Sequence, residues 1–113
     1  MKIKIKHEKT DFGDVWYYNE KNNILRFAIY RYDDDIDTIY LSNVFVNSEY
    51  RQHGYGNKIL NTVDKIAKEL GASSICLKVL KHSFPYGWYK KHGYIDLIDD
   101  TEEDKFIWLI KHI

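Results

Sequence analysis

The sequence predicts a single α+β domain, residues 1–113, built on a central mixed sheet of about seven strands with about two main helices. Two observations support this prediction. Up to Val46, apolar segments alternate with short polar turns, which is typical of an antiparallel meander. After Val46, a segment with helical periodicity lies between two apolar segments, and this order predicts two parallel strands joined by a right-handed crossover helix.

The first half of the chain is expected to form four strands. The first alternates lysine and isoleucine strictly, as an edge strand protected by lysine would. The connection after it, residues 8–13, is too short for a pair of helices, and polar turns join the later strands. The four predicted strands are Lys2–Lys6, Val15–Tyr18, Ile24–Tyr32 and Thr38–Val46.

The second half is expected to contain both helices. From Asn57 to Leu70 the apolar residues lie three or four positions apart, which is one face of a helix, and Gly71 is a natural stop. Ser83 suits the N-cap of a short helix that ends at Gly93. The remaining predicted strands are Ser73–Leu80, Tyr94–Ile98 and Phe106–Lys111, with an acidic loop at residues 99–104 between the last two.

Composition limits the classes of function. The chain carries 17 basic and 17 acidic residues, so it lacks the basic excess of a nucleic-acid-binding surface. Its one cysteine, Cys76, lies in an apolar segment, which predicts a buried structural thiol and a reducing compartment. No cysteine and histidine cluster has zinc spacing, so no metal is expected. Neither a signal peptide nor a membrane-spanning segment is recognisable, and we therefore expect a cytoplasmic protein.

The segment from Val44 to Leu60 carries the most specific signal. A short apolar strand ends at Val46, and Gly54 and Gly56 precede the helix. The start of a helix leaves unpaired N–H groups that attract anions, and glycines let a phosphate approach the backbone. The alternative is a turn in which the glycines only supply positive φ angles. The third glycine of a dinucleotide fingerprint and the Gly-Lys-Ser/Thr of a P-loop are both missing, which excludes those two sites.

Two motifs in this half resemble those of the GNAT superfamily, the acetyl-CoA-dependent N-acyltransferases. The family's cofactor loop reads Arg/Gln-x-x-Gly-x-Gly/Ala after a strand ending in valine, and Arg51-Gln52-His53-Gly54-Tyr55-Gly56 fits every fixed position. Downstream, Trp88-Tyr89-Lys90-Lys91-His92-Gly93-Tyr94 is similar to the family's Tyr-x-x-x-Gly-Phe/Tyr segment. The resemblance extends from about Thr38 to the C-terminus, and two motifs in order are more specific than either alone.

This resemblance implies a GNAT-like sheet and direct transfer of an acetyl group from the cosubstrate acetyl-CoA to a primary amine on a small molecule or a protein. By resemblance, Tyr89 is the general acid that protonates the departing CoA sulfur, because a tyrosine with a pKa of about 10 is protonated at neutral pH. The alternative for Tyr89 is packing alone. The residues implied to bind the cofactor are Phe45, Val46, Arg51, Gln52, His53, Gly54, Tyr55, Gly56 and Asn57.

The chain also departs from the family pattern. GNAT enzymes usually place two helices between the first two strands, and because residues 8–13 cannot hold them, we expect an open acceptor groove. Some members use a carboxylate on the fourth strand as a base, but Thr38–Val46 contains none. His82 is a candidate base, and the alternative is a purely structural histidine. The acidic loop is a candidate site for a cationic amine, and the alternative is a solvated loop. Asn57 is expected either to cap the helix or to bind a phosphate.

These departures leave a second function open. The chain could be a GNAT-fold binding module that acts through CoA or protein contacts with little or no catalysis. The sequence is compatible with a monomer and with a homodimer, and it predicts neither a nucleic-acid partner nor a membrane partner.

Overall fold

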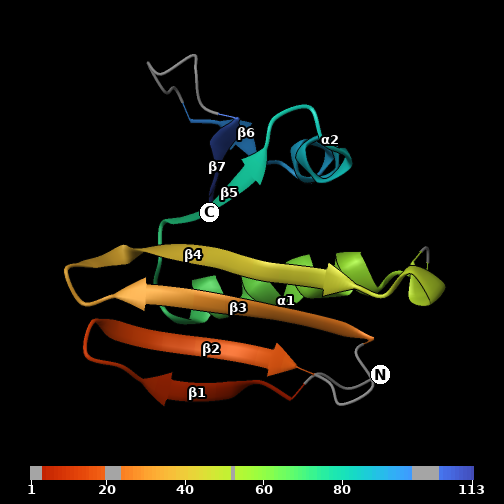
Figure 1. The fold of residues 1–113 in the computed structure, drawn as a ribbon. Coiled ribbons are helices and arrows are strands. Elements are labelled where there is room, and N and C mark those ends of the chain that lie inside the picture. Colours follow the sequence, from red (N-terminus) through yellow and green to blue (C-terminus); the bar gives the residue numbers. More distant parts are fainter. Residues whose placement is uncertain (1–3, 20–23, 52, 98–104) are drawn as a thin grey trace.

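The structure, a computed structural model, describes residues 4–19, 24–51, 53–97 and 105–113. Within them a seven-stranded mixed sheet has the order β1-β2-β3-β4-β5-β7-β6, with two α-helices (Figure 1), which confirms the predicted α+β class. The strands are β1 (Lys6–Lys9), β2 (Gly13–Asn19), β3 (Leu25–Tyr32), β4 (Asp35–Val46), β5 (Ser74–Leu80), β6 (Ile95–Asp96) and β7 (Phe106–His112). The helices are α1 (Tyr55–Glu69), α2 (Phe84–Lys91) and the short 3-10 helix η1 (Ser48–Tyr50).

The antiparallel meander from β1 to β4 is confirmed, but the first strand is not where the sequence predicted it. Strand β1 begins at Lys6, where the expected strand ended, and residues 1–3 lie outside the described part of the chain. The turn sets this register. Thr10 bonds twice to the Gly13 carbonyl, through its backbone N–H at 2.7 Å and its hydroxyl at 3.0 Å, so that Lys9 pairs with Asp14. A tight turn at residues 10–13 therefore outweighs the lysine–isoleucine alternation.

The crossover unit from β4 through α1 to β5 is also confirmed, since β4 and β5 are parallel. Helix α1 begins at Tyr55, two residues before the predicted start, because Gly54 takes the N-cap position. Helix α2 begins as predicted after the N-cap Ser83, whose hydroxyl accepts a hydrogen bond from the Tyr86 N–H at 3.3 Å. Cys76 is buried in β5, as expected for a structural thiol.

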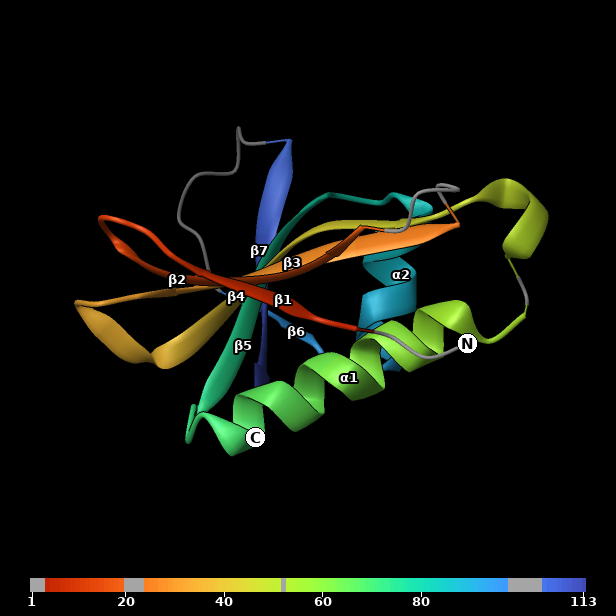
Figure 2. The same cartoon turned by 90° about the horizontal axis from the view of Figure 1, so that it is seen from below.

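Both α-helices cover the same face of the sheet (Figures 1 and 2). Apolar side chains from β3, β4, β5 and β7 point to this side and form the core with the apolar stripe of α1. The fully buried members with the largest side chains are Tyr94, Phe27, Leu25, Ile29, Ile39, Ile59, Ile75, Leu109 and Val63. Neither α-helix in the described residues has the length and apolar character needed to cross a membrane.

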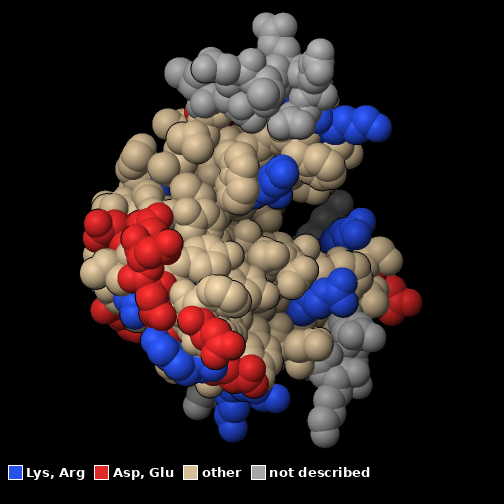
Figure 3. All heavy atoms as spheres, turned by 60° about the vertical axis from the view of Figure 1, so that its left-hand side comes forward, with Lys and Arg blue, Asp and Glu red and all other residues tan. Residues whose placement is uncertain are grey.

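The opposite face of the sheet, which we call the open face, carries no helix within the described residues. Because side chains alternate along a strand, the neighbours of the core residues point here. Figure 3 shows the surface hollowed between the two halves of the sheet, with Lys and Arg side chains near the opening. Acidic side chains gather instead toward the turns that join β1 to β2 and β3 to β4. No described helix covers the open face, and the acceptor groove expected from the short β1–β2 connection stays a prediction.

Candidate active site

The two parallel strands at the centre of the sheet diverge. Strands β4 and β5 pair only at Thr38–Ser74, Ile39–Ile75 and Tyr40–Cys76. Beyond Tyr40, strand β4 carries an extra residue opposite β3, because Ala28 pairs with Ser42 whereas Arg26 pairs with Phe45. Asn43 lies at this bulge with a φ of 56°. A bulge bends its strand, which accounts for the divergence and leaves the β5-facing edge of β4 without a strand partner there.

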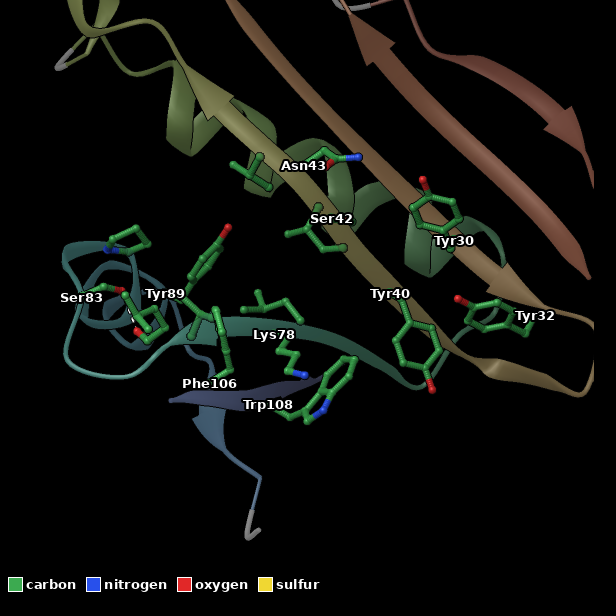
Figure 4. A pocket seen from close by; sticks show the side chains of 16 residues that line it. Tyr30, Tyr32, Tyr40, Ser42, Asn43, Lys78, Ser83, Tyr89, Phe106 and Trp108 are labelled. Atoms are coloured by element: carbon green, nitrogen blue, oxygen red, sulfur yellow. Dashed lines mark hydrogen bonds between the residues drawn. The ribbon is translucent and has the colours of Figure 1, made fainter. Parts of the chain in front are cut away.

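The divergence creates a cavity of about 660 Å³ (Figure 4). It opens toward the open face, where ring side chains from three strands surround it. We call this set the aromatic wall: Tyr30, Tyr32, Tyr40, Phe106 and Trp108. Tyr40 lies between two other members of the aromatic wall, because its ring makes edge contacts with Tyr32 at 5.3 Å and with Trp108 at 6.0 Å between centroids.

Tyr89 reaches the same cavity from the helical side of the sheet. It lies on α2, the residue is only 6% exposed, and its side chain points toward β4 (Figure 4). Its ring packs against Trp88 at 4.9 Å and Tyr94 at 5.5 Å between centroids. Burial raises the pKa of Tyr89 to about 12, so its hydroxyl keeps its proton throughout the neutral range. This arrangement provides a proton donor at the point where β4 and β5 part.

The loop before α1 lies at the end of β4. Gly54 adopts a φ of 80°, a left-handed conformation that favours glycine, and a Cβ there would meet no atom within 4 Å. Among the described residues, no side chain caps α1, so its first N–H groups are available to an anion. Arg51 is tied back to the strand, because its Nε donates to the Val46 carbonyl at 3.2 Å. The loop thus offers an uncapped helix start with open space around it.

A family model for the acetyltransferase (GNAT) domain matches residues 11–96. The chain belongs to the GNAT acetyltransferase family. Tyr89 and the β4 segment beyond its pairing with β5 line the cavity, whereas the start of α1 follows the end of β4 and does not line it.

Solved structures agree with the GNAT fold. A GNAT acetyltransferase from Elizabethkingia anophelis with acetyl-CoA bound is 15% identical, covers 98% of both chains and has a TM-score of 0.69. A Bacillus subtilis acetyltransferase in complex with CoA is 14% identical, covers 99% of both and has a TM-score of 0.67. An acetyltransferase from Streptococcus agalactiae is 18% identical over 89% of this chain and 67% of its own, with a TM-score of 0.73.

The predicted cofactor residues divide into two groups in this GNAT structure. Phe45 and Val46 lie on the β4 segment beyond its pairing with β5, and Arg51, His53, Gly54 and Tyr55 form the loop and the first helical residue. His53 stacks on Tyr55 at 6.2 Å between centroids, and both contact the Tyr50 ring. Gln52 lies outside the described residues.

Gly56 and Asn57 have packing roles that their motif positions did not reveal. A Cβ on Gly56 would lie 2.8 Å from Cζ2 of Trp88, so glycine is needed there to let α1 contact α2. Asn57 does not cap α1, because its Oδ1 lies 2.7 Å from Nε2 of His92. The sequence separation of these partners hid both contacts.

The other candidates from the sequence do not add a base. His82 is exposed and does not line the cavity; its ring lies 6.1 Å from that of Tyr86. The acidic loop, residues 99–104, lies outside the described part of the chain. No described group of three or more His, Cys, Asp or Glu side chains could hold a metal ion.

Sequence reasoning missed the aromatic wall and Lys78, which lines the cavity from β5. The sequence did contain one signal for these residues, the alternation of positions along a single strand, as in Lys78 and Leu80 or Phe106 and Trp108. That signal identifies residues that share a face, but it does not say which two strands diverge.

Proposed function

We propose that this GNAT protein transfers the acetyl group of acetyl-CoA to a primary amine by direct attack, with Tyr89 as the general acid. The observation that carries the proposal is the burial of Tyr89 at the divergence of β4 and β5, which raises the pKa of its hydroxyl to about 12. Neighbouring structures with acetyl-CoA or CoA bound support the choice of cosubstrate. Three parts of this chain could contact that molecule.

The edge of β4 around Phe45 and Val46, which has no strand partner on the β5 side, offers backbone groups to the amide-containing arm of CoA, as an added strand would. The Val46 carbonyl there already accepts the Arg51 Nε–H. The uncapped start of α1 with Gly54 offers N–H groups and open space to its pyrophosphate. The thioester would then lie in the cavity near Tyr89, and the amine would approach from the open face.

In the reaction the amine nitrogen forms a bond to the thioester carbonyl carbon, and the carbon–sulfur bond breaks. Tyr89 donates its proton to the leaving sulfur, and the proton lost by the nitrogen restores the phenol, so the products are an amide and free CoA thiol. No histidine or carboxylate appears among the described residues lining the cavity, so the amine must arrive neutral or lose its proton to water. Holding both reactants in one cavity would supply much of the rate gain.

Calorimetric titration with acetyl-CoA tests cofactor binding, using Gly54→Asn and Gly54→Asp as a matched pair. Both side chains tolerate the left-handed φ of this position and have the same size, but only aspartate adds negative charge. We expect Gly54→Asp to bind about tenfold or more weakly than Gly54→Asn. Folded wild-type protein that fails to bind acetyl-CoA at millimolar concentration would refute the proposal.

Release of free CoA in the presence of amines tests catalysis. Tyr89→Phe keeps the ring and removes the hydroxyl, and we expect it to lower kcat by about 100-fold. Because no histidine or carboxylate is found among the described residues that line the cavity, a second function is considered, that of a CoA-binding module. That function would be indicated by tight acetyl-CoA binding together with CoA release that no amine accelerates.

A further inference from the structure

The cavity has an unusual distribution of charge. Lys78 is the one charged residue among the described residues that line it. It lies on β5 just beyond the last position that pairs with β4. Its Nζ lies 5.7 Å from the centroid of Phe106 and 5.9 Å from that of Trp108 (Figure 4). Within the described chain no carboxylate comes within ion-pair distance of this ammonium.

The position of Lys78 indicates that it would contact the acceptor rather than the cosubstrate. Lys78 pairs with Trp108 and shares the open face with the aromatic wall. The loop at Gly54 and helix α2 with Tyr89 lie on the helical side. This step rests on the proposed function, because it takes the thioester to lie between the two sides. An acceptor that enters from the open face then meets Lys78 and the aromatic wall before it reaches Tyr89.

We infer that the acceptor carries a carboxylate and an aromatic or apolar body in addition to its amine. An ammonium held over ring faces keeps N–H donors that a carboxylate can accept, and the rings of the aromatic wall offer apolar surface to the body. A purely cationic acceptor, such as a polyamine, would be repelled by Lys78 with no described carboxylate in the cavity to offset the repulsion. The acceptor class is therefore that of an apolar amino acid.

Binding of two reaction products isolates the carboxylate. N-acetyl-L-phenylalanine and N-acetyl-L-phenylalaninamide have nearly the same shape, and neither has an amine that titrates, so they differ only in carrying a carboxylate or a neutral carboxamide, which also donates hydrogen bonds. We expect the acid to bind about tenfold more tightly than the amide at low salt, in calorimetric titrations with and without CoA present. Lys78→Gln should abolish the difference, and Lys78→Arg should retain it. Lys65→Gln, at an exposed position on α1, is the control and should leave it unchanged.

The inference is wrong if the acid fails to bind, if acid and amide bind equally, or if their difference survives in folded Lys78→Gln. Circular dichroism establishes that each variant is folded. Acetyl transfer to L-phenylalanine and to spermidine separates this inference from the proposed function. Lys78-dependent binding of the acid without CoA release would refute the enzyme but not the ligand class. Rapid transfer to spermidine without binding of the acid would refute the ligand class but not the enzyme.

Discussion

The Asn57 side chain at the start of α1 meets the His92 side chain at the end of α2, with Oδ1 and Nε2 2.7 Å apart. The other ring nitrogen of His92 lies 2.8 Å from the Trp88 carbonyl oxygen, and Trp88 lies against Gly56. The two helices are thus joined at one point by a polar and a steric contact. Because α1 begins at the cofactor loop and α2 carries Tyr89, this joint sets the position of the proposed acid relative to the proposed pyrophosphate site.

The polar contact predicts energetic coupling between Asn57 and His92. In a double-mutant cycle with Asn57→Ala and His92→Ala, we expect a coupling of about 0.5–1.5 kcal/mol in the free energy of unfolding, measured by urea denaturation. Asn61→Ala, at an exposed position on the same helix, is the control. It measures how much stability the change from asparagine to alanine adds through helix propensity alone, an effect that is also part of Asn57→Ala. Strict additivity of the two single changes would show that the contact does not stabilise the fold.

The steric contact predicts opposite effects of alanine at two helical glycines. Gly56→Ala should destabilise the protein by about 1–3 kcal/mol, because its Cβ would lie 2.8 Å from the Trp88 ring. Gly87→Ala on α2 should be neutral or stabilising by up to about 1 kcal/mol, because a Cβ there meets no atom within 4 Å. Thermal unfolding measures both, and the Gly56 prediction fails if the two variants unfold at the same temperature.

The raised pKa of Tyr89 predicts the shape of the rate profile. Because that pKa is about 12, the proposed acid stays protonated well above pH 10. Since no described histidine or carboxylate lines the cavity, kcat/KM should rise with pH up to the pKa of the acceptor amine and then level off. Initial rates between pH 6 and about 10.5 test this. A decline centred near the ordinary tyrosine pKa of about 10 would contradict the burial of the acid.

The same pKa shift predicts a loss of stability at high pH. The folded-state pKa of Tyr89 lies above its unfolded value, so its contribution is fully present below about pH 10 and is lost as the pH rises through about 12. Burial also raises the pKa of Tyr94, which adds to the effect. Urea denaturation between pH 8 and about 11 should show a shallower decline in Tyr89→Phe than in wild-type protein. Parallel declines would mean that Tyr89 ionises normally in the folded state.

Local signals predicted most of the fold. The apolar spacing after Asn57 identified α1, and Ser83 marked the start of α2 because an N-cap is a local interaction. Strand β1 was displaced because all its residues are exposed, so burial does not set its register and the Thr10 turn does. A contact between strands is likewise not visible in a single segment of sequence, as Gly13 on the neighbouring strand β2 shows. Gly13 is needed because a Cβ would lie 2.0 Å from the Arg31 carbonyl oxygen, which belongs to another strand.

The candidate site was predictable on its helical side and not on the open face. The motifs located the loop and Tyr89, because both consist of neighbouring residues. Lys78 and Trp108 come from separate strands that pair with each other, and the cavity beside them forms where the bulge at Asn43 bends β4 away from β5. A bulge depends on pairing between strands, and no single segment of sequence contains that information.

Helices on one face alone divide each central strand into two kinds of position. On β5, Leu77 and Val79 belong to the hydrophobic core, whereas Lys78 between them does not. A substitution of a residue on the open face therefore leaves the composition of the core unchanged. A substitution in the core likewise leaves the side chains of the open face unchanged. Selection, or a protein engineer, can therefore change the residues proposed to meet the acceptor while the core residues on the helical side stay the same.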